Sequence, residues 1–206
     1  HNAIRLLLPV INALTASSPF IEGKFSGFHD TRVEVYRTNS SFIPSITGFI
    51  IPEPITGIND YRNNILSRIY SDLEKYDPGK IISHEWVNAR GCIARFERGA
   101  IEIRTCDIQE CPGADIICAR LIIEVLKKLV YEEVSTLKDQ LAPDTFSLYK
   151  ILTSVIRHGG SAIIDDISYL KIFGLKKPYR ALEFWEKMAG LFFSETAGDS
   201  FLLSNI

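Results

Sequence analysis

The chain has 206 residues, of which 46% are hydrophobic and 23% charged, so it can form one large domain or two small ones. Its 23 basic residues are balanced by 25 acidic ones, and a net charge of −2 gives no long-range attraction to nucleic acid or anionic lipid. Nucleic-acid binding is therefore not expected. A membrane span is not expected either, because Arg120 interrupts the best apolar run, and a span needs roughly 18 apolar residues.

The first residues indicate that this chain is part of a longer protein. The only methionine is Met188, so we expect further residues before His1. Residues 2–16 could pass for a signal peptide, with Arg5 followed by an apolar run and small residues. We expect instead a buried helix, which Pro9 either kinks or opens in its second part.

Residues 17–41 are rich in serine, glycine and charge, which is typical of a functional loop. We predict that the loop leads into a short strand at residues 32–36. Arg32 and Arg37 are its candidate binding residues, with two ordinary surface arginines as the alternative. His29 is expected to be a solvated loop residue.

Apolar residues recur every three or four positions in several later segments, which predicts helices with one buried face. A helix from Gly113 should pack on the apolar face of the hairpin described below, and residues 49–51 should form a short strand or an extended segment. The predicted helices cover residues 58–76, about 113–129, 145–158, 164–173 and 178–193.

Residues 81–109 predict a β-hairpin that carries chemistry. From residue 100 to 106 the side chains alternate, so Glu102 and Arg104 share one face while Ile101 and Ile103 share the other. Gly99 allows a tight turn back onto a strand at residues 90–97. The turn should bring Arg95 near Glu102 and leave the charged face toward an open groove.

Glu102 and Arg104 lie two residues apart, so their Cα atoms are about 6.5 to 7 Å apart and both can reach one ligand. A carboxylate suits Mg²⁺, and a planar guanidinium suits phosphate or carboxylate oxygens. The alternative is a cross-strand ion pair on a solvated face. The crowding of further charges on the same hairpin favours the ligand site; they are Arg90, Arg95, Arg98 and Asp107.

Four cysteines lie within a short span, at positions 92, 106, 111 and 118. They contain no C-x-x-C pair and have no neighbouring histidine, so structural zinc is disfavoured. A disulfide is the second alternative. We predict free thiols, which suit a reducing cytoplasm.

Two long motifs together resemble the glutamate–cysteine ligase type 2 family of carboxylate–amine ligases. The first is ALTASSPFIEGKFSGFHDTRVEVYR, which contains Arg32; the second is GAIEIRTCDIQECP, preceded by HEWVNARG, which contains Glu102 and Arg104. The resemblance spans about residues 4–129 and less surely 157–166. It implies an α+β fold in which helices pack on one face of an antiparallel sheet, as part of a glutamine-synthetase-like fold.

The resemblance also implies a reaction and a division of the chain. Residues 1–206 would be the C-terminal portion of a ligase domain, with the sheet and active site in 1–135 and a helical part in 136–206. ATP would activate a carboxylate as an acyl phosphate, which an amine then attacks. The missing N-terminal half would supply further metal ligands, so the fragment alone is expected to be inactive. The expected substrates are small molecules, namely amino acids, with glutamate and cysteine implied by the family.

The implied site residues are Glu102 for Mg²⁺, Arg104 and Arg32 as catalytic groups, and Arg90 or Arg95 for ATP. A longer spacer before Glu102 than is common in the family leaves open which of Arg90 and Arg95 is the family arginine. A bulge at Gly91 would restore Arg90 to the Glu102 face. The basic helix end Arg157-His158-Gly159-Gly160 resembles a family segment near the active site, although an ordinary helix C-terminus explains it.

Two other functions remain as alternatives. A guanidino-kinase-like phosphotransferase also gathers arginines around ATP, but would need a denser arginine set and a reactive cysteine. A ligase-like domain that binds a metabolite or partner without turnover is the other. For the ligase we expect a cytoplasmic protein, which could form a homo-oligomer.

Overall fold

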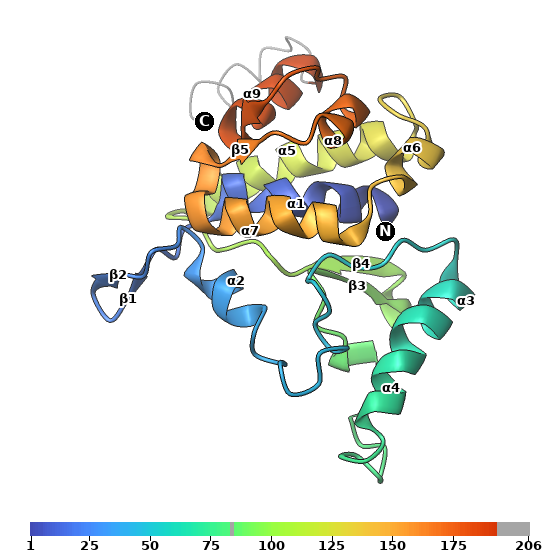
Figure 1. Ribbon diagram of the computed structural model, residues 1–206. Helices are drawn as coiled ribbons and strands as arrows, with labels where there is room; N and C mark the ends of the chain where they lie inside the picture. Colours follow the sequence, from blue (N-terminus) through green and yellow to red (C-terminus); the bar gives the residue numbers. More distant parts are fainter. Residues whose placement is uncertain (83–84, 193–206) are drawn as a thin grey trace.

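The fold is organised around helix α1 (Asn2–Thr15), which lies at the centre of a layer of helices (Figure 1). A computed structural model describes residues 1–82 and 85–192 of the protein. Ten of the 14 residues of α1 are buried, because apolar side chains occur on every side of it. The predicted buried helix is confirmed, with Pro9 inside it.

Pro9 removes one hydrogen bond from the middle of α1, because proline has no N–H for the carbonyl four residues earlier. On either side of it, side chains from the C-terminal third bind helix carbonyls. Tyr169 Oη donates to the Leu6 carbonyl at 3.0 Å, and Trp185 Nε1 donates to the Val10 carbonyl at 2.7 Å. Both donors are fully buried, so these bonds fix the C-terminal helices on α1.

Helices from the second half of the chain surround α1 (Figure 1). Their positions confirm the three predicted C-terminal helices to within three residues, except that position 193, the predicted end of the last, lies outside the described residues. Gly159 follows α7 with a positive φ of 55°, as expected for a helix C-terminus. The helices are α5 (Pro112–Val130), α6 (Leu137–Leu141), α7 (Thr145–His158), α8 (Ile167–Ile172) and α9 (Ala181–Phe192).

The predicted hairpin forms beneath this layer (Figure 1). Strand β3 (Cys92–Arg95) pairs antiparallel with β4 (Ala100–Ile103) through a turn at Phe96–Arg98. Gly99 ends the turn in the left-handed conformation, with φ 57°. The α+β fold class is therefore confirmed. The register corrects one detail: Ile93, not Arg95, lies directly opposite Glu102.

The helix that covers the hairpin is also different from the one predicted. Helix α5 packs on α1 and α9, while α1 makes the closer contact with β3. Cys92 and Ile103 form a cross-strand pair and join the core around α1. Ile101, two residues along the same face, is 37% exposed, because the hairpin extends beyond the helical layer.

A second, smaller core lies under the other end of the hairpin. The predicted helix at 58–76 forms as α3 (Ile58–Tyr61), a π-helical turn at residues 62–66, and α4 (Ser67–Leu73). Its buried face contacts Ala94 and Phe96 of the hairpin and consists of Tyr61, Ile65, Leu66, Ile69 and Leu73. The stripe is confirmed, although Ile58 and Tyr76 at its ends are exposed.

The segment before the second core differs most from expectation. Residues 31–36 form a helix, α2 (Thr31–Tyr36), and the predicted strand at 32–36 is wrong. The reason is local: the Asp30 side chain accepts a hydrogen bond from the Val33 N–H at 2.8 Å and caps the helix. Before it, β1 (Phe20–Ile21) and β2 (Lys24–Phe25) form a small hairpin. Further on, Ile50 and Ile51 are buried, but the segment has only an isolated bridge between Phe49 and Ile51 rather than a strand.

Two more short strands, β5 (Ile163–Ile164) and β6 (Tyr179–Arg180), pair beside α9. Among the residues described, no helix has both the length and the apolar character needed to cross a membrane.

Candidate functional site

The hairpin brings one carboxylate between two guanidinium groups. Glu102 Oε1 lies 3.1 Å from Arg104 Nε, and Glu102 Oε2 lies 3.4 Å from Arg95 Nη1. The Glu102 side chain is 40% exposed, so it remains accessible. The predicted proximity of Arg95 to Glu102 is confirmed, although the contact is diagonal rather than directly across the strands.

Three elements hold the Arg104 side chain. Besides Glu102, its Nη1 donates to the Asn88 carbonyl at 3.2 Å and to Tyr36 Oη, at the end of α2, at 3.4 Å. Its Nη2 makes no hydrogen bond to any residue that the structure describes. The side chain is 28% exposed, so a fixed guanidinium keeps free donor capacity toward solvent.

Arg95 is more deeply placed. Its guanidinium carbon lies 3.7 Å from the centre of the Trp86 ring, and its side chain is only 4% exposed. It contacts Glu97 at 3.3 Å as well as Glu102, so it links the strand to the turn. Its Nε is buried without a hydrogen-bond partner among the described residues. Arg95 therefore places a guanidinium beside Glu102 and keeps one hydrogen-bond donor without a partner.

Arg90 lies apart from Glu102. It is 1% exposed and forms a two-pronged pair with Glu53, at 2.6 and 2.7 Å. Its Nη1 donates to the Ser45 carbonyl and to Asn88 Oδ1. Gly91 does not bring Arg90 to the Glu102 face: its N–H donates to the Ile50 carbonyl, and its carbonyl accepts from the Arg104 N–H.

Arg32 reaches the segment that leaves β4. Its Nε forms an ion pair with Asp107, and its Nη2 donates to the Thr105 carbonyl at 2.7 Å. The side chain is 41% exposed. Arg37, the other candidate of this loop, pairs with Glu34 and donates to Tyr149 Oη at 3.2 Å, which turns it away toward α7.

Two buried carboxylates organise this region, Asp30 and Asp107. The sequence did not identify Asp30, and it indicated Asp107 only as one of the charges crowding the hairpin. Asp107 accepts hydrogen bonds from the Ser17 N–H at 3.0 Å and from Ser18 Oγ at 2.7 Å, besides Arg32. Asp30 binds Asn12, and burial raises the pKa of its carboxyl group. The available signals were the helix-cap position of Asp30 and the position of Asp107 three residues after Arg104.

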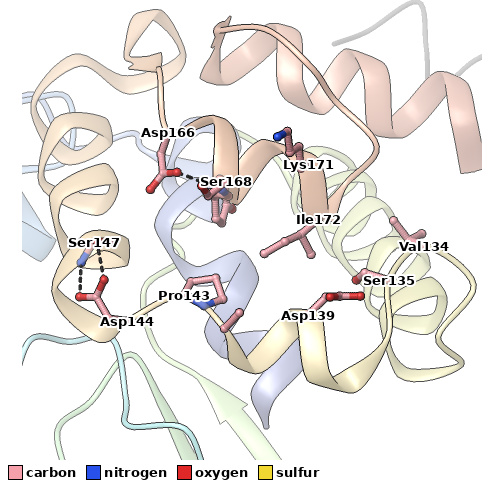
Figure 2. A pocket seen from close by; sticks show the side chains of 12 residues that line it. Val134, Ser135, Asp139, Pro143, Asp144, Ser147, Asp166, Ser168, Lys171 and Ile172 are labelled. Atoms are coloured by element: carbon pink, nitrogen blue, oxygen red, sulfur yellow. Dashed lines mark hydrogen bonds between the residues drawn. The ribbon is translucent and has the colours of Figure 1, made fainter.

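Two hollows in the surface lie in different places relative to this arrangement. One of about 390 Å³ lies beside the turn of the hairpin and is lined partly by Trp86, Phe96 and Glu97. A larger one of about 610 Å³ lies away from the hairpin, between α6, α7 and α8 (Figure 2). Its carboxylates serve local structure: Asp144 and Asp166 cap helices, and Asp139 binds Thr136. We place the candidate site at the hairpin, where charged groups remain accessible.

The cysteines play no visible part in the candidate site. All four are free, and Cys92 is fully buried, which raises the pKa of its thiol to about 12. Such a thiol is unreactive at neutral pH. His29 lies against Gly159 at the end of α7, and its backbone N–H bonds the Ile156 carbonyl at 3.1 Å.

Fold and site define a class: an α+β protein whose antiparallel hairpin presents an accessible carboxylate between two arginines. A family model described as glutamate-cysteine ligase family 2 matches residues 1–151, a range that contains every candidate residue above. The chain therefore belongs to glutamate-cysteine ligase family 2, as the resemblance of its two motifs implied.

A curated relative from Archaeoglobus fulgidus, described as an uncharacterized protein, is 42% identical over 127 residues. The matched region covers 62% of this chain but 34% of the relative. The chain thus spans about a third of the length of the relative it matches.

Proposed function

We propose that the protein containing this chain is an ATP-dependent carboxylate–amine ligase of the glutamate–cysteine ligase type, acting on amino acids in the cytoplasm through an acyl phosphate. Family membership supports a ligase. The observation that carries the proposal is the placement of Glu102: an accessible carboxylate, 3.1 Å from Arg104 and 3.4 Å from Arg95. A metal ligand next to fixed guanidinium groups suits phosphoryl chemistry.

The donor set fits one ligand of a Mg²⁺ ion rather than a complete shell. Within residues 1–82 and 85–192, no three His, Cys, Asp or Glu side chains are arranged to hold a metal. Mg²⁺ commonly takes one or two carboxylates together with waters and phosphate oxygens, so Glu102 is a sufficient contribution from this chain. Bound as its ATP complex, the ion would neutralise charge on the phosphates.

The arginines then divide into direct and supporting roles. Arg104 would grip the transferred phosphoryl group through its accessible guanidinium, and Arg95 would add positive charge beside it. Arg90 would support Arg104 through Asn88, which accepts from Arg90 with its side chain and from Arg104 with its carbonyl. Arg32, bonded to the backbone at Thr105, would also act through Arg104.

Substitution of the pair in the complete protein tests this proposal. Glu102→Gln should raise the Mg²⁺ concentration needed for turnover, because an amide keeps an oxygen but loses the charge that attracts the ion. Arg104→Lys should lower kcat on the order of 10²-fold and weaken ATP binding far less, because lysine keeps the charge but loses the planar fork. Both are measured by steady-state kinetics over a Mg²⁺ titration.

Matched controls are Glu110→Gln and Arg98→Lys, which make the same chemical changes at exposed positions of the same region. They should leave kcat and the Mg²⁺ dependence unchanged. If the Glu102 and Arg104 variants behave like these controls and lose only about 0 to 1 kcal/mol of stability, the cluster is a surface ion-pair network and the proposal fails. ATP binding without product formation by the wild type would identify a binding domain instead.

A further inference from the structure

The carbonyl of Thr105 is held by two side chains from distant parts of the chain. Asn12 Nδ2 donates to it at 2.9 Å and Arg32 Nη2 at 2.7 Å. Arg32 Nη1 also donates to the carbonyl of Arg104 at 3.3 Å. Thr105 is fully buried, so these bonds fix the backbone on the C-terminal side of Arg104 in a region where water cannot replace them.

Each of the two donors is itself held by a buried carboxylate. Asp107 binds Arg32 and also accepts hydrogen bonds from the Ser17 N–H and the Ser18 hydroxyl. Asp30 binds Asn12. We call the arrangement of Asp107, Arg32 and the two carbonyls at residues 104 and 105 the clamp.

Helix α2 connects the clamp to the Arg104 side chain. Arg32, in its first turn, binds the backbone at Arg104 and Thr105, while Tyr36, its last residue, accepts a hydrogen bond from the Arg104 guanidinium. One short helix therefore contacts both ends of Arg104. On the opposite side, the Arg104 N–H donates to the Gly91 carbonyl at 2.8 Å, so the backbone is held from both directions.

We propose that Asp107 is a positioning residue of the ligase site: by holding Arg32 on the carbonyls of residues 104 and 105, it sets the direction in which Arg104 points. This inference rests on the proposed function of Arg104. Without the negative charge of Asp107, the half-exposed Arg32 side chain loses the partner that orients it, and α2 and the backbone of Arg104 can shift relative to each other. A misplacement of about 1 Å at a reacting centre can cost on the order of 10²-fold in rate.

The kinetic test uses Asp107→Asn in the complete protein, with Asp165→Asn, an exposed aspartate, as the matched control. Asp107→Asn should lower kcat at least about tenfold while the KM for ATP changes less than about twofold, because a positioning fault weakens the transition state more than ground-state binding. Arg32→Lys, which keeps the charge but not the fork, should do the same and serves if Asp107→Asn does not fold.

A double-mutant cycle separates positioning from simple stability. When Arg104→Lys is already present, Asp107→Asn should cost little further kcat, since there is no planar fork left to orient. Independent, multiplicative losses in kcat would overturn the proposal. So would a kcat equal to that of the Asp165→Asn control.

A readout that does not need catalysis distinguishes failure of the clamp from failure of the proposed function. The ¹⁵N order parameter of the Arg104 Nε–Hε group, measured by NMR in the absence of substrates, should fall in Asp107→Asn and Arg32→Lys but not in Asp165→Asn. If the order parameter falls in these two variants but the wild-type protein shows no ligase activity, the proposed function is refuted and the proposed clamp stands. An unchanged order parameter for Arg104 would refute the clamp whatever the activity.

Discussion

Burial makes the thiol of Cys92 a source of pH-dependent stability. Its pKa rises from the ordinary value of 9.0 to about 12, so the native state holds the proton more tightly than the unfolded chain does. The resulting stability is fully present below about pH 9 and is lost as the pH rises from there toward 12. Linkage sets the loss at about 1.4 kcal/mol per pH unit within that window.

This effect can be measured with Cys92→Ala, which cannot titrate. The difference in free energy of unfolding between wild type and Cys92→Ala should shrink by about 1.4 kcal/mol per pH unit above pH 9, measured by urea denaturation. A constant difference for Cys92→Ala up to pH 11 would mean that this thiol is solvated in the native state.

Single residues of the site could be predicted where a local pattern determines their direction. Alternation along a strand was sufficient to put Glu102 and Arg104 together, and a turn at Gly99 was sufficient to add Arg95. Asp107 was noted only as one of the charges on the hairpin, because its role depends on Arg32, 75 residues earlier in the chain. The pairing of Arg90 with Glu53 was missed for the same reason.

At the level of elements, α2 shows why a short pattern can mislead. Its residues are rich in β-branched and aromatic side chains, which favour a strand. The cap formed by Asp30 and the contacts of Arg32 and Tyr36 with the segment after β4 outweigh that preference. Elements with long apolar periods, such as α5 and α7, were predicted well, because tertiary contacts reinforce the same pattern.

The same substitution should have opposite effects on stability at two glycines, one beside the hairpin and one in α9. At Gly91 an added Cβ would lie 2.8 Å from Ile50 Cγ2 and 3.0 Å from Thr105 Cγ2, so Gly91→Ala should destabilise the protein by about 1 to 3 kcal/mol. At Gly190, inside α9, an added Cβ meets nothing within 4 Å, and Gly190→Ala should stabilise it by about 0.5 to 1 kcal/mol.

Urea denaturation of both glycine variants gives the comparison directly. Because the Gly91 carbonyl also accepts the Arg104 N–H, its variant should lower the kcat of the proposed ligase, whereas Gly190→Ala should not. If Gly91→Ala were neutral in stability, the close packing of the hairpin against Ile50 would be wrong.

At the scale of the whole molecule, the described residues form two hydrophobic cores of unequal size that meet at the hairpin. The core around α1 has 31 buried residues, whereas the core of α3 and α4 has five. Cys92 belongs to the first, and Ala94 and Phe96 contact the second. The sequence predicted the helices of both cores but not their partners, because periodicity shows which face of a helix is buried and not what covers it.

This inequality predicts that the two cores open at different free energies. Native-state hydrogen exchange should show amides of α4 exchanging through openings of lower free energy than amides in the middle of α1, because few buried apolar contacts hold α4 in place. Amides of β3 should exchange through openings of intermediate free energy, since the strand packs against the core of α1 but borders the smaller core.

A pair of large-to-small substitutions makes the prediction decisive. Ile69 and Leu7 are both fully buried, so replacing either by alanine should lower the stability of the core that contains it by about 2 to 5 kcal/mol. Ile69→Ala should lower the protection of α4 and leave that of α1 nearly unchanged, because α4 can open while the larger core stays folded. Leu7→Ala should lower protection everywhere, since the smaller core does not persist once α1 and the hairpin separate. Equal losses of protection across both cores in the two variants would show that the molecule unfolds as one unit.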